Sequence, residues 1–208
     1  MKRALSAVVG IASFLVTEGL IIDANADLIS FGFTADVISA SDRLSRTFNT
    51  SQTLSGSVTY ESSTPDLNSL DPNNGRYESA VKALSFTVGQ YTGTFSGQDV
   101  INVNVGTGVS FFLSSAFSGE NVGGARPLQL LLGLFSDKGF STDALPLVLP
   151  SDLHGQAIVQ FVDPVVTPPI FQVEGNIMSV TMIPEPSTLL LLATGLVALL
   201  FYRKRFVS

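Results

Sequence analysis

Hydrophobic and polar residues alternate with a period of two along most of the chain. The first clear stretch has apolar residues at every second position: Ile29, Phe31, Phe33, Ala35 and Val37. This alternation is typical of a half-buried β-strand, because successive side chains point to opposite faces. Helical periodicity is nearly absent between the two terminal apolar segments. The pattern therefore predicts an all-β domain.

Further stretches of the same kind follow at 54–60, 84–88, 91–95, 101–105, 109–117, 157–161 and 171–182. Gly89-Gln90 lies between two of them and predicts a two-residue hairpin turn. Residues 127–135 are apolar on both sides, which favours a central strand or one covered by a loop over a short helix. Residues 143–152 contain Pro146 and Pro150, which predict an extended segment that crosses from one sheet to another. About nine strands, rich in Gly, Ser and Thr, predict an antiparallel β-sandwich or jelly roll. The order of the strands stays open.

The N-terminal segment has the features of an export signal. Lys2 and Arg3 precede an apolar stretch over residues 4–16, and Ala24 and Ala26 form the small-x-small pattern that signal peptidase cleaves. We therefore predict a signal peptide helix within residues 1–26 and export by the general secretion machinery. An uncleaved N-terminal anchor is the alternative.

Three features follow one another near the C-terminus: Pro184-Glu185-Pro186, an apolar run over residues 188–202, and Arg203-Lys204-Arg205. The prolines favour an extended backbone before the run. As a helix, the run would span about 22 Å, less than the roughly 30 Å of a hydrocarbon core. The basic residues predict the cytoplasmic side of this membrane helix.

In this order, the three features over residues 183–208 resemble the PEP-CTERM sorting signal of Gram-negative bacteria that make exopolysaccharide. The resemblance implies that the chain is a substrate of exosortase, a membrane protease-transpeptidase, and that Pro184, Glu185 and Pro186 are its recognition motif. It also implies a transient inner-membrane intermediate, followed by the cell surface or the extracellular matrix. An ordinary single-pass tail anchor is the alternative.

Composition limits what the exported domain, residues 27–182, can do. The chain has no cysteine, so the domain depends on packing and has neither disulfides nor cysteine-ligated metal. Residues 27–202 hold six Lys and Arg against fifteen Asp and Glu, a formal net charge of −9. This acidic surface disfavours nucleic acid and anionic lipid as partners.

Candidate chemistry is sparse. His154 is the single histidine, and we interpret it as a loop residue rather than a catalytic base. Ser79 and Lys82 have the Ser-x-x-Lys spacing of penicillin-recognising enzymes, but the companion motifs do not occur. We therefore assign no catalytic residue and no cofactor.

One polar loop invites a calcium interpretation. Asp66, Asp71, Asn73 and Glu78 offer the hard oxygen ligands that this ion prefers. The spacing departs from the EF-hand pattern, and a turn over residues 71–75 explains the same residues.

Together, these patterns predict a non-enzymatic surface or extracellular-matrix protein that associates with exopolysaccharide. Two alternatives remain: a secreted glycan hydrolase with a pair of facing carboxylates, and a permanently anchored envelope protein.

Overall fold

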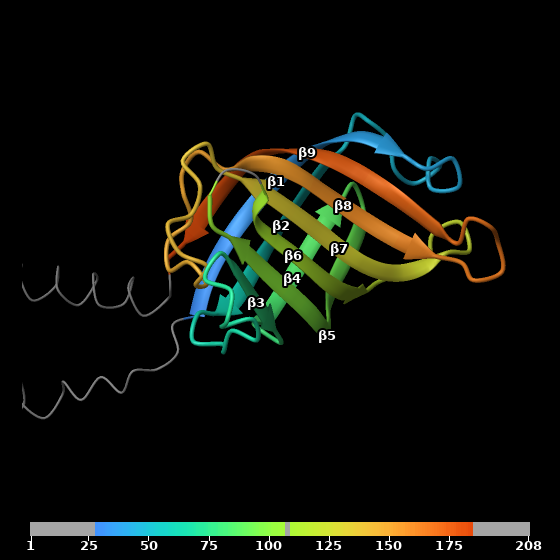
Figure 1. The fold of residues 1–208 in the computed structure, drawn as a ribbon. Helices are drawn as coiled ribbons and strands as arrows, with labels where there is room; N and C mark the ends of the chain where they lie inside the picture. Colours follow the sequence, from blue (N-terminus) through green and yellow to red (C-terminus); the bar gives the residue numbers. More distant parts are fainter. Residues whose placement is uncertain (1–27, 107–108, 185–208) are drawn as a thin grey trace, which may run out of the picture.

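The computed structural model describes residues 28–106 and 109–184, and this part of the chain contains nine β-strands (Figure 1). The strands are β1 (Leu28–Ala40), β2 (Thr53–Glu61), β3 (Asn74–Glu78), β4 (Val81–Val88), β5 (Tyr91–Asn104), β6 (Val109–Ser118), β7 (Arg126–Phe135), β8 (His154–Val162) and β9 (Ile170–Ile183). The described ranges contain no helix long and apolar enough to cross a membrane. The all-β prediction is confirmed, whereas the predicted terminal helices lie outside the described residues.

The nine strands form one antiparallel sheet that closes on itself. Its order is β3-β5-β4-β2-β1-β9-β8-β7-β6, and β5 also pairs with β6. Eight strands therefore make a closed barrel, to which β3 is added, and the predicted division into a two-layer sandwich or jelly roll is not what forms. Closure pairs the edges that an open sheet would leave exposed.

Two strands differ from the sequence prediction although the count agrees. The stretches predicted at 91–95 and 101–105 are one strand, β5, which bends at a register shift between Phe95 and Asp99. β3 was not predicted, because it lies in a segment rich in turn residues. β4 pairs with the first part of β5 and β3 with the last part, so the two short strands continue one another along β5.

Inward side chains fill the barrel, as expected for a barrel of eight strands. They include six fully buried large residues: Phe31, Tyr60, Phe86, Phe111, Leu113 and Phe161. Glycines make room for the rings. Phe33 covers Gly56 on the neighbouring strand, where a Cβ would lie 2.7 Å from Cζ of Phe33, and Phe86 covers Gly93 in the same way.

Both ends of the barrel are closed by loops. We name the end that carries Leu28 and Pro184 the terminal end, and the other the distal end (Figure 1). At the distal end, residues 41–52 insert Leu44 and Phe48, which are 0% and 1% exposed. At the terminal end, residues 136–153 insert buried leucines: Leu145, Leu149 and Leu153. The segment predicted to cross between sheets is thus a plug, because its prolines prevent ladder pairing while its leucines still require burial.

Candidate functional site

The predicted sorting motif begins where the barrel ends. Ile183 is the last residue of β9 and Pro184 is the last described residue, and both are exposed. Glu185, Pro186 and the basic residues Arg203, Lys204 and Arg205 lie outside the described residues, as do Ala24 and Ala26. The structure therefore places the start of the motif and leaves the other predicted processing residues untested.

The two predicted processing sites are attached to neighbouring strands. Ser30 of β1 pairs with Ile183 of β9, so the first and last described residues lie at the same end of the barrel. Signal peptide cleavage after Ala26 would leave only Asp27 before β1. The described chain therefore begins and ends on neighbouring strands at one side of the terminal end.

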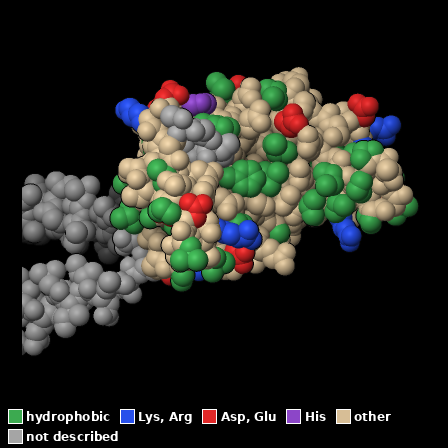
Figure 2. Space-filling model, in the orientation of Figure 1, with side chains coloured by type: hydrophobic (Ala, Val, Ile, Leu, Met, Phe, Trp, Pro, Cys, Tyr) green, Lys and Arg blue, Asp and Glu red, His purple; other side chains and the backbone are tan. Residues whose placement is uncertain are grey.

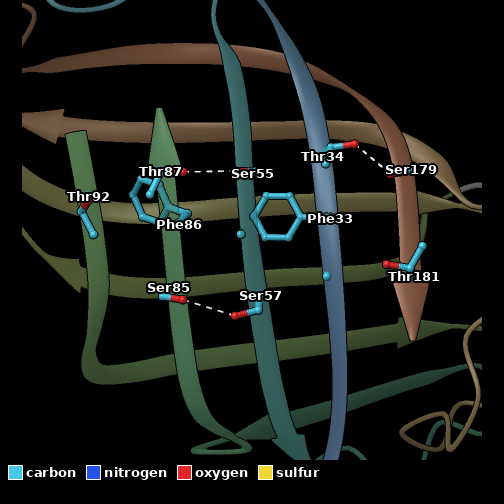
Figure 3. Close-up of a pocket in the computed structure, with 12 residues that line it drawn as sticks. Phe33, Thr34, Ser55, Ser57, Ser85, Phe86, Thr87, Thr92, Ser179 and Thr181 are labelled. Atoms are coloured by element: carbon cyan, nitrogen blue, oxygen red, sulfur yellow. Dashed lines mark hydrogen bonds between the residues drawn. The ribbon is translucent and has the colours of Figure 1, made fainter. Parts of the chain in front are cut away.

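The outer face beside this exit is an ordered array of hydroxyl groups (Figure 3). Hydroxyls on adjacent strands are hydrogen bonded across the sheet, in the pairs Ser30–Thr59 at 2.8 Å, Thr34–Ser179 at 2.7 Å, Ser55–Thr87 at 3.1 Å and Ser57–Ser85 at 3.2 Å. The rows follow from strand register, because residues facing one another across β9, β1, β2 and β4 share the outer face. The array carries no charged side chain among these eight residues.

A shallow hollow of about 480 Å³ lies over the middle of this array. Its lining includes the outward hydroxyl residues Thr34, Ser55, Ser57, Ser85, Thr87 and Thr181, together with Gly32. Small side chains create the depression, and the buried Phe33 and Phe86 line it together with Gly56. The hollow can offer donors and acceptors to a neutral polar ligand without the desolvation cost of a buried charge.

A second hollow, of about 490 Å³, contains the one buried carboxylate of the described residues. Asp99 is 8% exposed, and its Oδ2 accepts a 3.1 Å hydrogen bond from the backbone N–H of Val81. Its Oδ1 has no hydrogen-bond partner, and burial raises the pKa of this carboxyl group. The carboxylate thus closes the break between β3 and β4, where Ser79 has a φ of 59°.

Sequence reasoning did not select Asp99, although a signal was present. Asp99 has the same strand parity as the inward Ile101 and Val103, so an acid stands where the alternation requires an apolar residue. Glu78 lines the same hollow but forms a 2.8 Å ion pair with Arg76.

A comparison with protein-family models matches residues 183–205 to the PEP-CTERM protein-sorting motif. The chain carries a PEP-CTERM sorting signal. The match starts at the last residue of β9, which agrees with the three features found in the sequence. This signal marks an exported protein that exosortase sorts to the cell surface through a membrane-anchored intermediate. Neither the curated proteins nor the solved structures contain a match to the chain.

The calcium candidates of this PEP-CTERM protein make hydrogen bonds within their own loop. Asp66 Oδ1 accepts from the backbone N–H groups of Asn68 and Arg76, both at 2.8 Å. Asp71 accepts from Asn73 N–H at 3.0 Å and from the Asn74 side chain at 2.6 Å, and these bonds lower its pKa. Within the described ranges, no three metal-ligating side chains of the His, Cys, Asp and Glu types gather.

Of the other candidates, His154 lies outside both hollows, whereas Ser79 lines the second one. His154 begins β8, is exposed and stacks on Phe135 with ring centroids 5.9 Å apart. Ser79 occupies the strand break, and its carbonyl accepts a 3.3 Å hydrogen bond from Lys82 Nζ. Lys82 also pairs with Glu61 at 2.7 Å.

Proposed function

We propose that the chain is a non-enzymatic surface or matrix protein, which exosortase processes at the Pro184–Pro186 motif and which associates with exopolysaccharide. The observation that carries the proposal is the sorting motif, which starts directly after the last strand of a closed barrel. The basic tail would lie on the cytoplasmic side and the barrel on the other, which would place the motif beside the membrane, within reach of a membrane transpeptidase.

The hydroxyl array supports the exopolysaccharide part of this proposal. Neutral sugars present hydroxyl groups, and the hollow between β9 and β5 presents complementary hydroxyls on a rigid sheet. The acidic net charge of the exported region favours a neutral glycan over a polyanionic one. A long polymer gains avidity by contacting many copies, so weak single contacts suffice.

Mass spectrometry of the native exported protein tests the sorting step. Cells with exosortase are expected to yield a chain truncated near Pro184–Ser187, and cells without it a chain that keeps Arg203–Ser208. An intact tail in both strains would instead favour permanent anchoring in the envelope.

Glycan binding is tested separately by co-sedimentation of the protein with the exopolysaccharide of the host. Ser57→Glu places a bulky charge in the hollow and is expected to abolish binding. Ser96→Glu is the matched control, because Ser96 is exposed on β5 and is not part of the hollow. Equal binding by both variants would refute the hydroxyl array as the glycan site.

A secreted glycan hydrolase is the second candidate, and it is favoured by one observation. Asp99, whose pKa burial raises, and Glu78 line the same hollow, and glycoside hydrolysis uses one acid of raised pKa with a second carboxylate. Release of reducing sugar from the host glycan, lost in both Asp99→Asn and Glu78→Gln, would establish this activity. Absence of release by the native protein would reject it.

A further inference from the structure

The terminal end of the barrel carries most of the exposed apolar side chains in the described residues. Seven of the eleven large hydrophobic residues that are exposed lie there, and all but Met182 form three pairs: Leu67 and Leu70, Leu147 and Val148, and Leu28 and Ile183. We name these six residues the apolar rim. Leu70 is 98% exposed and Val148 is 74% exposed, so neither contributes to the core. Figure 2 shows hydrophobic side chains grouped at this end, on the left of the described part of the chain.

Contacts across the terminal end hold the rim together. Leu28 pairs with Glu61 at the end of β2, and the loop with Leu67 and Leu70 starts there. Tyr60 donates a hydrogen bond to the carbonyl of Pro146, and Tyr77 donates one of 2.9 Å to the carbonyl of Asp143. Leu147 and Val148 are therefore held beside the ends of β1 and β2, although their loop comes from β7 and β8.

The short connection between β9 and the apolar run determines how far the rim can lie from the membrane. Only four residue steps separate Pro184 from Thr188, the first residue of the apolar run. Fully extended chain covers at most about 3.6 Å per residue, so these steps span about 14 Å. A headgroup layer is about 5–8 Å thick, so while the run is inserted the terminal end stays within about 6–9 Å of the headgroup surface.

We infer that the apolar rim is a docking surface for the outer leaflet of the inner membrane, and that it seats the barrel on lipid while the sorting signal is inserted. The inference rests on the proposed sorting intermediate. The tether supplies a high local concentration of lipid, so a small apolar area is enough to keep the barrel seated. After exosortase cuts the tether, this local concentration is lost and the barrel is released.

The acidic charge of the terminal end determines which lipid headgroups it can approach. The loops over residues 62–73 and 136–153 contain five Asp and one Lys, a formal net charge of −4. Acidic side chains around the rim repel anionic headgroups. The docking partner is therefore a neutral, zwitterionic lipid surface, and phosphatidylglycerol is expected to weaken docking.

The chain contains no tryptophan, which permits a direct test in reconstituted vesicles. The full chain is inserted into phosphatidylcholine vesicles that contain headgroup-proximal spin-labelled lipid, as the variant Leu70→Trp or Val165→Trp. Val165 is the matched control, since it is 88% exposed at the distal end. We expect the emission of Leu70→Trp to be quenched and shifted to shorter wavelength, and that of Val165→Trp to be unchanged.

Three results would overturn the inference. Flotation of both variants with equal, low quenching would show that the barrel is tethered but undocked, and would leave the sorting proposal intact. Failure of the chain to float would refute the tether and the docking together. A Leu70→Trp shift that grows with the protein-to-lipid ratio would identify a second copy of the chain as the occupant.

A second variant pair tests the consequence for the tether. Leu67→Ser combined with Leu70→Ser removes apolar area from exposed positions, and Val165→Ser is its control. In vesicles, added protease is expected to cut between Ile183 and Thr188 faster in the double variant than in the control. Equal cutting rates would contradict docking through the rim.

Discussion

Both ends of the barrel are closed by an inserted loop, but different interactions hold the two loops in place. At the distal end, Phe48 packs against Tyr91 and Phe161 with ring centroids 5.4 and 5.8 Å apart. Arg43 fastens this end by a 2.6 Å ion pair to Asp163. At the terminal end, leucines and tyrosine hydrogen bonds hold the plug, and apolar side chains remain exposed around it.

Charge separates the two ends as well. The distal loops over residues 41–52, 119–125 and 163–169 contain three acidic residues and two Arg, a formal net charge of −1, against −4 for the two loops at the terminal end. At the distal end, aromatic packing against the core stabilises the fold itself. The other end combines exposed leucines with repelling charge, a pattern explained by a nearby surface rather than by folding stability.

Alkaline unfolding is expected to give the largest difference between the ends. Burial, with the nearby charges of Asp66 and Asp143, raises the pKa of Tyr77 to about 12, and burial also raises the pKa of Tyr60. Stability from these groups is complete below their unfolded pKa of about 10 and is lost as the pH rises through the folded value.

Ionised Tyr77 can no longer donate to the loop 136–153, and Tyr60 ceases to donate at still higher pH, so the terminal end should begin to open first as the pH rises from 10 towards 12. Tyrosinate absorbance and hydrogen exchange of the two plugs measure this order. Opening of residues 41–52 before residues 136–153 would contradict it.

Truncating one buried side chain in each plug is expected to have the next largest effect. Phe48→Ala is expected to lower the free energy of unfolding by about 3–5 kcal/mol, and Leu149→Ala by about 2–4 kcal/mol, because each leaves a cavity. Denaturant titration measures both values, with Val165→Ala as an exposed control. A cost for Leu149→Ala below about 1 kcal/mol would mean that the terminal plug contributes little to the core.

Substituting Asp99 should destabilise the break between β3 and β4, near the terminal end. Asp99→Ala leaves the Val81 N–H without its acceptor and is expected to cost about 1–3 kcal/mol. Because the folded pKa of Asp99 is raised, the native protein loses stability as the pH rises from about 3.8 through that folded value. Asp99→Asn keeps an acceptor for the Val81 N–H and removes this pH dependence. Unfolding of the two variants at several pH values therefore separates the contribution of this hydrogen bond from that of the carboxylate charge.

Removing a tyrosine hydroxyl at each end is expected to give the smallest change in the free energy of unfolding, and it compares the two ends directly. Tyr60→Phe removes a hydrogen bond to the terminal plug and should lower the free energy of unfolding by about 1 kcal/mol. The hydroxyl of Tyr91 is buried without a hydrogen-bond partner in the described structure, so Tyr91→Phe should leave stability unchanged or raise it. Equal destabilisation by both changes, in thermal unfolding, would mean that these hydroxyls do not distinguish the ends.

Local pattern was enough for most strands and for the sorting signal. Period-two alternation located β1, β2, β4, β6, β8 and β9, because the side-chain direction in a strand depends only on sequence position. A run that is apolar on both sides located β7. The sorting motif at 183–205 was equally readable, since it is a short linear segment. These features need no contact between distant residues.

Tertiary structure decided what depends on long-range closure. Pairing of β5 with β6 converts the expected sandwich into a barrel, and this pairing is a property of the whole sheet rather than of either strand. The same closure turned residues 143–152 into a plug and buried Asp99 beneath the break between β3 and β4. It also brought Leu70 and Val148 to one end, because only the folded chain sets which loops share a surface.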